Sequence, residues 1–145
     1  MTQALETVSQ NLMFGGVQSV YRHKSMATNT EMEFSVFIPD HGEHTLPPVL
    51  YYLSGLTCNW ENFTTKAGVQ RYAAEHGVII VAPDTSPRGN SVPDDETYDF
   101  GQGAGFYVNA IEDPWKDHFQ MYDYIVNELP PIIDASFKTD PSRVG

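Results

Sequence analysis

Apolar and polar residues alternate along residues 31–39, EMEFSVFIP, in the pattern of a β-strand. One side of this strand carries Met32, Phe34, Val36 and Ile38, and the other carries Glu31, Glu33, Ser35 and Phe37. A period of two is the spacing of side chains that share one face of a strand. The pattern therefore predicts a strand with one buried face and one face exposed to water.

Two other segments are apolar without interruption. They are PVLYYLS, residues 48–54, and VIIVAP, residues 78–83. Strands that are covered on both faces in a parallel sheet have continuous apolar runs of this kind. We therefore expect both segments to lie inside a sheet.

The segment between these strands, TTKAGVQRYAAEHG, has the spacing of a helix. Val69, Tyr72 and Ala73 fall on one helical face, Thr64 is a suitable N-cap, and Gly77 is a suitable C-terminal stop. A strand, a helix and a second strand in this order predict a parallel crossover.

A long irregular region, roughly residues 84–117, follows the second of these strands and is rich in Pro, Gly and Asp. Loops of this length in a compact domain are often functional. Apolar residues then recur at intervals of three and four over residues 118–137, which predicts an amphipathic helix. We expect a kink at Pro130 and Pro131, because proline lacks the helix N–H donor. The terminal Arg-Val-Gly resembles the start of another buried strand.

Composition and charge restrict the class of protein and its partners. The chain has 145 residues, is 41% hydrophobic and carries a formal charge of −11, which fits one soluble domain over residues 1–145 and disfavours nucleic acid or anionic membranes as partners. No window resembles a membrane helix, and the start, MTQALETVSQN, does not resemble a signal peptide. The single cysteine, Cys58, permits no internal disulfide, so we expect a cytoplasmic protein.

The turn LSGLTC, residues 53–58, follows an apolar strand at the edge where open α/β sheets bind ligands. Ser54 is a poor nucleophile candidate, because it lacks the flanking glycines of a G-x-S-x-G elbow. Cys58 would need a base and an orienting acid, and no histidine stands in a recognisable local relation to it. Gly55 and Leu56 offer a backbone N–H that can bind an oxyanion. A purely structural glycine turn explains the same residues equally well.

Seven motifs along the chain resemble those of the S-formylglutathione hydrolases, the esterase D family. They occur in the family's order and spacing from about residue 15 to the end, and are LSGLTC, ENFTTKAG, APDTSPRG, GQGAGFYVNA, DPW, MYDY and NELP. The resemblance implies an α/β-hydrolase fold, with a mostly parallel sheet and helices on both faces. It also implies a cytoplasmic homodimer without metal or cofactor, which hydrolyses S-formylglutathione to glutathione and formate in formaldehyde detoxification. General carboxylesterase activity is implied as well.

The family's nucleophile elbow, G-H-S-M-G-G, is absent from these residues. In the family it follows a strand like Arg-Val-Gly, and the acid and histidine of the triad come later. The five histidines of the chain match none of the family's catalytic positions. The resemblance therefore implies an N-terminal portion of one hydrolase domain, with Leu56 as an oxyanion donor and the triad beyond Gly145. Two alternatives remain open: a non-catalytic fragment or binding subunit, and a thiol-dependent hydrolase that uses Cys58.

Further residues have both a binding and a structural interpretation. Arg88 either binds a substrate carboxylate or pairs with Asp84 to fix the long loop. The resemblance places GQGAGF beside the acyl pocket, where Gly103 and Gly105 permit close backbone packing. The substrate-binding candidates are Gly55, Cys58, Arg88, Phe106 and Tyr107, although aromatic side chains such as the last two also pack in cores.

The turn after the first strand contains residues that are also found at metal sites: Asp40, His41, Glu43 and His44. It lacks cysteine ligands and neighbouring groups that would orient the imidazoles. We therefore predict no metal site in this turn.

Overall fold

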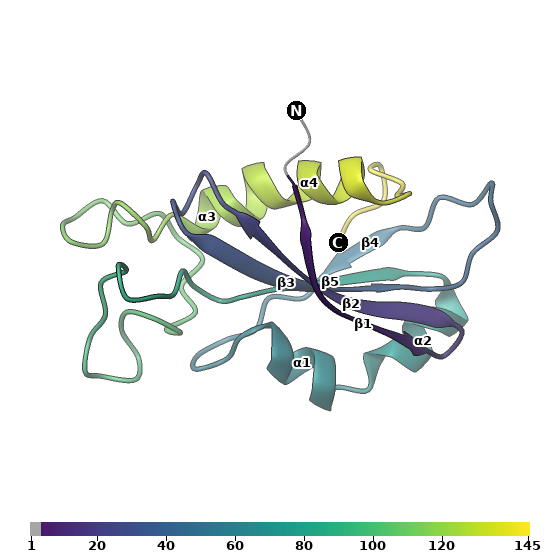
Figure 1. The fold of residues 1–145 in the computed structure, drawn as a ribbon, viewed down its shortest axis with the longest axis horizontal. Coiled ribbons are helices and arrows are strands. Elements are labelled where there is room, and N and C mark those ends of the chain that lie inside the picture. Colours follow the sequence, from purple (N-terminus) through teal and green to yellow (C-terminus); the bar gives the residue numbers. More distant parts are fainter. Residues whose placement is uncertain (1–3) are drawn as a thin grey trace.

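The computed structural model describes residues 4–145, which form a mixed sheet between two layers of helix (Figure 1). The strand order is β1-β2-β3-β5-β4, with a parallel pairing between β4 and β5 and antiparallel pairings elsewhere. The strands are β1 (Glu6–Met13), β2 (Gly16–Lys24), β3 (Glu31–Ile38), β4 (Val49–Tyr51) and β5 (Ile79–Pro83). The helices are α1 (Trp60–Lys66), α2 (Val69–His76), α3 (Met121–Asp123), the π-helical turn η1 (Tyr124–Glu128) and α4 (Leu129–Ser136).

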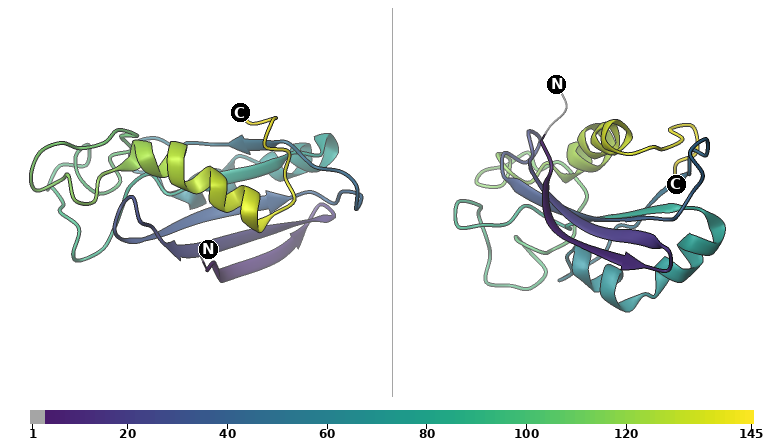
Figure 2. Two further views of the ribbon diagram at one scale, coloured as in Figure 1. Left: turned by 90° about the horizontal axis from the view of Figure 1, so that it is seen from above. Right: turned by 45° about the vertical axis from the view of Figure 1, so that its right-hand side comes forward.

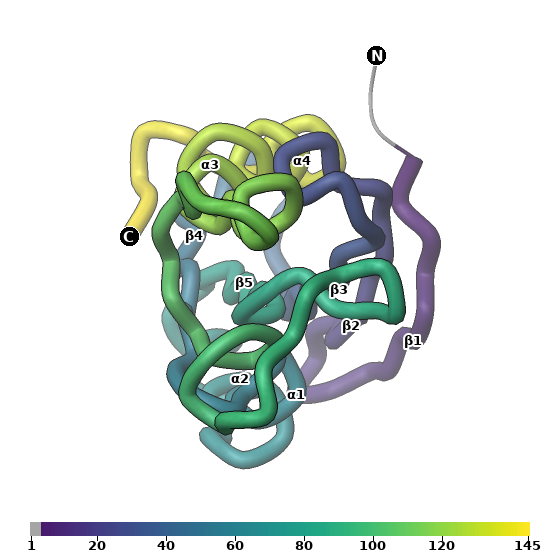
Figure 3. The backbone as a smooth tube through the Cα atoms, turned by 90° about the vertical axis from the view of Figure 1, so that its left-hand side faces the viewer, coloured from purple at the N-terminus to yellow at the C-terminus, as the bar shows by residue number. Residues whose placement is uncertain are grey.

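Helices cover the two faces of the sheet unequally. The short helices α1 and α2 lie below β3 and β5 in Figure 1, and the continuous run of α3, η1 and α4 lies above the sheet, as the end-on view in Figure 3 also shows. The larger core forms beneath this second layer from Phe34, Val81, Tyr124 and Ile133, among others. The sheet is therefore buried on both sides at its centre.

Strand β3 lies where the alternating pattern predicts a strand. The face predicted to be exposed to water is exposed only at its start, where Glu31 is exposed and Glu33 is half-buried, and the prediction is wrong for Ser35 and Phe37. Ser35 is 2% exposed and Phe37 is 1% exposed. Phe37 packs with Ala73 and Ile80, and the Ser35 hydroxyl is hydrogen bonded to that of Thr64. Both residues are buried because α1 and α2 cover this face.

The two continuous apolar segments have different surroundings. All residues of β5 are buried, as predicted, and the parallel crossover between β4 and β5 is confirmed. Strand β4 is shorter than predicted, and the expectation of cover on both faces is wrong for it within the described residues. Leu50 is 42% exposed, because α1 and α2 contact β3 and β5 rather than β4.

The crossover contains two helices instead of the single predicted helix. Thr64 is not the N-cap: α1 begins earlier, at Trp60, where the Asn59 side chain accepts a hydrogen bond from the Glu61 N–H. Gly68, with φ +66°, separates the two helices. Gly77 ends α2 in a left-handed conformation, as predicted.

The hairpin of β1 and β2 was not predicted from the sequence. Its turn consists of Phe14 and Gly15, and both have positive φ, as a two-residue type I′ turn requires. Every residue of β1 is exposed, so the strand has no buried face that could create an alternating apolar pattern.

The predicted helix after the long loop starts at Met121, three residues later than expected, and continues to Ser136. The π-helical turn η1 interrupts this helix, and the Leu129 N–H donates to the Tyr124 carbonyl there. The turn precedes Pro130 and Pro131, which lie in the first turn of α4, where a missing N–H is tolerated. No helix within the described residues, this one included, is long and apolar enough to cross a membrane.

The last residues begin another strand, as predicted from Arg-Val-Gly. Val144 pairs in parallel with Val49. The Val49 N–H donates to the Arg143 carbonyl over 3.1 Å, and the Tyr51 N–H donates to the Gly145 carbonyl over 2.8 Å. These residues therefore occupy the edge of β4 that faces away from β5.

Candidate active site

The carboxyl ends of β4 and β5 lie at the same end of the sheet. In the left view of Figure 2 the long loop of residues 84–117 gathers at this end of the molecule, and the turn of residues 54–58 follows β4 there. Ligands of open α/β sheets bind at the carboxyl ends of the strands. The geometry of this turn therefore decides what the site can do.

Residues 55–58 form a tight turn in which the Cys58 N–H donates to the Gly55 carbonyl over 3.2 Å. Thr57, the third residue of this turn, has φ +65°, as in a type II turn. This conformation is rare for a β-branched residue and costs roughly 1–3 kcal/mol. The surrounding contacts must therefore hold the turn in place.

The backbone N–H groups of the turn differ in their partners. The Thr57 N–H donates to the Gly103 carbonyl over 2.8 Å. The Leu56 N–H has no acceptor among the residues that the structure describes, and Leu56 is 42% exposed. A fixed and unsatisfied donor of this kind is suited to stabilise an oxyanion. The geometry thus favours Leu56 over Thr57 for that role.

Gly105 packs directly on the peptide between Gly55 and Leu56. A Cβ atom at Gly105 would lie 2.9 Å from the Gly55 carbonyl carbon and 3.2 Å from the Leu56 nitrogen. Gly105 also has φ +75°, which disfavours any side chain. The close backbone packing predicted for Gly103 and Gly105 is therefore present, and it supports the turn from one side.

Arg88 forms the predicted ion pair with Asp84. Its Nε lies 2.9 Å from Asp84 Oδ2 and 3.1 Å from Oδ1. Burial raises the pKa of the Asp84 carboxyl, and the hydrogen bond and charge of Arg88 oppose this change. A second Arg88 nitrogen donates to the Cys58 carbonyl, so the guanidinium contacts the turn itself.

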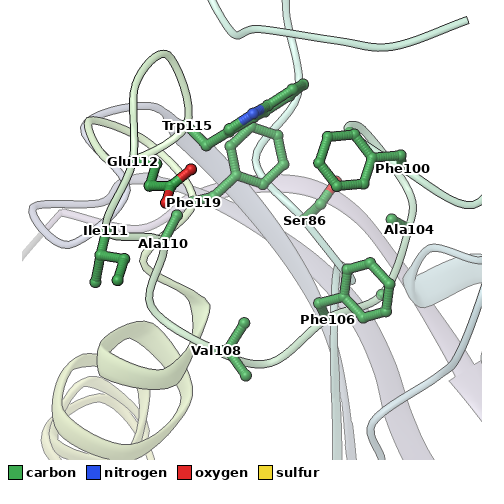
Figure 4. A pocket seen from close by; sticks show the side chains of 12 residues that line it. Ser86, Phe100, Ala104, Phe106, Val108, Ala110, Ile111, Glu112, Trp115 and Phe119 are labelled. Carbon is green, nitrogen blue, oxygen red and sulfur yellow. The ribbon is translucent and has the colours of Figure 1, made fainter.

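An apolar cavity of about 200 Å³ lies beside the turn (Figure 4). Gly105 lines this cavity and also packs on the Gly55–Leu56 peptide. Figure 4 shows aromatic side chains around the cavity, and its lining consists of Ser86, Phe100, Gly101, Ala104, Gly105, Phe106, Val108, Ala110, Ile111, Glu112, Trp115 and Phe119. The cavity thus provides apolar space close to the Leu56 donor.

The two aromatic candidates lie in different places. Phe106 lines the cavity and is 57% exposed. Tyr107 is not part of the lining: it is half-buried against the larger core and directs its hydroxyl at Ser54. The structure therefore brings Phe106, and not Tyr107, to the apolar space.

Cys58 is half-buried and has a free thiol. It lines a shallow groove of about 280 Å³ together with Tyr52, Ser54, Gly55, Asn62, Phe63, Lys66 and Ala67. Its side chain therefore lies on the same turn as the Leu56 donor and next to open space.

The histidines and acidic residues form no metal centre in the part of the chain that the structure describes, where no group of three or more His, Cys, Asp or Glu side chains is arranged to hold an ion. In the turn of residues 40–44, the His41 ring contacts the Gly42 carbonyl, and Glu43 and His44 are exposed.

Thr85 contributes to the site but was not singled out from the sequence. Its hydroxyl donates a short hydrogen bond to the Cys58 carbonyl, the same atom that Arg88 binds. The position of Thr85 could have indicated this role, because Thr85 comes directly after Asp84, which follows the buried strand β5. Hydroxyl side chains at such positions often bind neighbouring backbone.

The sheet, its two helical layers and the turn at the carboxyl edge are those of the N-terminal part of an α/β-hydrolase fold. The chain belongs to the esterase family described as "Putative esterase", whose pattern matches residues 25–144.

The predicted resemblance to S-formylglutathione hydrolases is confirmed by individual relatives. The chain is 55% identical to S-formylglutathione hydrolase of Paracoccus denitrificans (strain Pd 1222) over 145 residues, which is 100% of this chain and 52% of that protein. A solved S-formylglutathione hydrolase from Agrobacterium tumefaciens has a TM-score of 0.94 at 47% identity, and the match covers 97% of this chain and 51% of that one.

A more distant structure shares the fold alone. The ferulic acid esterase of Anaeromyces mucronatus has a TM-score of 0.62 at 17% identity, with 96% of this chain and 48% of that chain covered. The chain thus spans about half the length of the relatives that it matches.

Proposed function

We propose that residues 1–145 are the N-terminal portion of a single hydrolase domain that hydrolyses S-formylglutathione to glutathione and formate. The unsatisfied Leu56 N–H, held in a strained turn at the carboxyl edge of the sheet, is the observation that carries this proposal. The identity of 55% to an S-formylglutathione hydrolase supports the choice of substrate.

The proposed chemistry is acyl transfer to a serine and then to water. The serine lies on the continuation of the strand that starts at Arg143, beside β4. Its oxygen attacks the thioester carbonyl carbon while its proton passes to the triad histidine, and the carbonyl oxygen becomes an oxyanion that accepts a hydrogen bond from Leu56 N–H. Glutathione leaves as its thiol after it takes a proton from the triad histidine. Water, which gives a proton to the histidine, then attacks the formyl-serine ester; the ester bond breaks, the histidine returns the proton to the serine oxygen, and formate is released.

The second oxyanion donor in this proposal is the N–H of the residue after the serine. No metal or organic cofactor takes part, because polarisation of the carbonyl is supplied by the two backbone donors. The apolar cavity beside Gly105 is larger than a formyl group needs, so we also propose hydrolysis of simple carboxylic esters.

We propose that the enzyme is a cytoplasmic homodimer that serves formaldehyde detoxification. The single cysteine agrees with a reducing compartment.

The test replaces the amide between Gly55 and Leu56 by an ester in the semisynthetic complete enzyme. This change deletes one N–H donor and alters the shape of the turn little. We expect kcat for S-formylglutathione to fall by about 10² to 10³ and KM to change little, because the bond strengthens only as charge develops.

Leu56→Ala is the matched control, because it shortens the side chain and keeps the N–H. It should retain most of kcat. A folded ester variant with an unchanged kcat would remove Leu56 from the mechanism, and a complete enzyme without thioesterase activity would refute the proposed function.

A further inference from the structure

We propose that Arg88 is a positioning residue for the turn of residues 55–58, which it holds, together with Thr85, through the Cys58 carbonyl. The inference rests on the proposed function, because it concerns the turn that presents the Leu56 N–H. In this role Arg88 supports the turn that carries the oxyanion donor and does not bind a substrate carboxylate.

The Cys58 carbonyl oxygen accepts two hydrogen bonds from the segment after β5. Arg88 Nη2 donates to it over 2.9 Å, and the Thr85 hydroxyl donates to it as well. A hydrogen bond from a guanidinium is charge-assisted and stronger than a neutral one. The last residue of the turn is therefore fixed by two side chains that lie 27 and 30 residues further along the chain.

Arg88 is itself anchored to the sheet. Its Nε binds both oxygens of Asp84, which is only 8% exposed. The Asp84 N–H donates to the Glu33 carbonyl at 3.0 Å, and the Asp84 carboxylate accepts the Thr85 N–H at 2.6 Å. A continuous path of hydrogen bonds thus connects β3 to the Cys58 carbonyl through Asp84 and Arg88.

The same segment supports the second attachment of the turn. Gly103 accepts the Thr57 N–H through its carbonyl and donates its own N–H to the Ser86 hydroxyl over 2.7 Å. A Cβ atom on Gly103 would lie 3.3 Å from Arg88 Nη1, so the guanidinium packs on the Gly103 backbone. Residues 84–88 therefore hold both the Cys58 carbonyl and the backbone that binds Thr57.

The Leu56 N–H depends on these attachments because the Thr57 side chain makes no hydrogen bond within residues 4–145 that could hold the strained Thr57 conformation. If the Cys58 carbonyl were released, Thr57 would be free to leave the left-handed region and the peptide at Leu56 would rotate. An oxyanion donor acts only near 2.7–3.1 Å from the reacting oxygen, and a shift of about 1 Å can cost about 10²-fold in rate.

The two roles of Arg88 predict different kinetics. An arginine that binds a substrate carboxylate acts equally in the ground and transition states, so its loss raises KM and leaves kcat. A residue that orients an oxyanion donor affects mainly the transition state, so its loss lowers kcat. The distinction is measurable in the complete enzyme.

The experiment compares Arg88→Met, Arg88→Lys and Thr85→Val with the unsubstituted complete enzyme on S-formylglutathione. Arg88→Met should lower kcat by about 10- to 100-fold with KM within about twofold. Arg88→Lys should recover part of this loss, because an ammonium can still donate to the Cys58 carbonyl. Thr85→Val should cost less than Arg88→Met, because Arg88 still binds the carbonyl.

Two inhibitors supply a readout that a general loss of folding would not give. An alkyl trifluoromethyl ketone forms a serine adduct with an oxyanion, so it should lose affinity by the same factor as kcat. S-Methylglutathione, a ground-state competitor, should bind as before. Arg71→Met is the control, because Arg71 pairs with Glu75 on α2, is 65% exposed, and lies outside the site.

Raised KM, unchanged kcat and weaker S-methylglutathione binding in Arg88→Met would overturn the positioning role in favour of substrate binding. Unchanged kinetics in Arg88→Met and Thr85→Val would also overturn it, while the proposed function would stand. If Arg88→Met does not fold, Thr85→Val decides through the same kcat and ketone measurements. An inactive unsubstituted enzyme would refute the proposed function and, with it, this inference.

Discussion

The Tyr107 hydroxyl donates a hydrogen bond to the Ser54 carbonyl oxygen over 2.6 Å. This bond joins the glycine-rich part of the long loop to the residue that precedes the turn of the candidate site. Burial raises the pKa of Tyr107, so its hydroxyl remains protonated and keeps donating at physiological pH. Tyr107 thus has a structural contact to the site although it lies outside the apolar cavity.

Tyr107→Phe in the complete enzyme removes only this donor. We expect the free energy of unfolding to fall by about 1–2 kcal/mol, because the Ser54 carbonyl loses a partner in a half-buried place. Urea unfolding measures the change, and kcat should fall less than tenfold. Tyr98→Phe is the control, since Tyr98 is 71% exposed. Equal stability of the two variants would contradict a role for the bond.

Gly105→Ala tests the contact between Gly105 and the Gly55–Leu56 peptide. The new methyl group would overlap this backbone, and overpacking of this kind typically costs about 1–3 kcal/mol. Because the displaced peptide carries the proposed oxyanion donor, we expect kcat to fall by about 10²-fold, more than the loss of stability alone explains. Steady-state kinetics and urea unfolding of the same samples separate the two effects.

The control for this substitution is Gly15→Ala. Gly15 has φ +76°, almost equal to that of Gly105, but apart from Gly15 and its two chain neighbours no described residue has a heavy atom within 4 Å of the position of its Cβ. Gly15→Ala should lower stability through backbone strain and leave kcat unchanged. A kcat that falls equally in both variants would show that the contact with the turn is irrelevant.

Cys58 offers a test of the alternative thiol mechanism. A bulky thiol reagent should abolish activity, because Cys58 shares its groove with Ser54 and Gly55 and a large adduct would block the space beside the turn. Cys58→Ala should retain most of kcat and resist the reagent. If Cys58→Ala is as inactive as a variant without the elbow serine, the thiol is the nucleophile and the serine mechanism is wrong.

His23 gives the fold a dependence on pH. It is 3% exposed between Phe34 and Tyr124, and burial lowers its pKa from the usual 6.5, although the charge of Glu128 opposes the shift. The unfolded chain therefore takes up a proton before the native protein does. The contribution of neutral His23 to the free energy of unfolding is therefore complete above about pH 6.5. It is lost as the pH falls toward the lowered pKa of His23 in the native protein.

Urea unfolding of the complete enzyme between pH 5 and pH 8 measures this effect. The free energy of unfolding should decrease below about pH 6.5, and His23→Gln should reduce that decrease. Because the other titrating groups are the same in both proteins, the difference between the two curves isolates His23. Parallel curves would contradict the assignment.

Burial was predicted correctly from the sequence for β5, whose own residues are apolar throughout. All of β5 is buried, and its apolar run shows this directly. In contrast, β1 is exposed along its whole length, and the Phe14–Gly15 turn lacks the usual Asn-Gly signal. The face of β3 with Ser35 and Phe37 appeared polar, because its cover comes from helices later in the chain.

Local sequence patterns predicted the site only where local backbone determines it. The small residues after β4 indicated a turn, and the resemblance to a family pointed to Leu56 and to close packing at Gly103 and Gly105. The contact of Gly105 with the Gly55–Leu56 peptide and the hydrogen bond from Arg88 to the Cys58 carbonyl join segments about 30 to 50 residues apart. No periodicity or spacing encodes such contacts, which depend on tertiary packing.

The pairing of Val49 with Val144 has a consequence for synthesis on the ribosome. The N–H groups of Val49 and Tyr51 receive their partners from Arg143 and Gly145 only after more than 90 further residues have been made. At roughly 5–20 residues per second, this edge of β4 waits about 5 to 20 seconds without a partner. The nascent chain therefore exposes a template for intermolecular strand pairing throughout that interval. Translation speed between the two segments is thus expected to influence the yield of soluble enzyme.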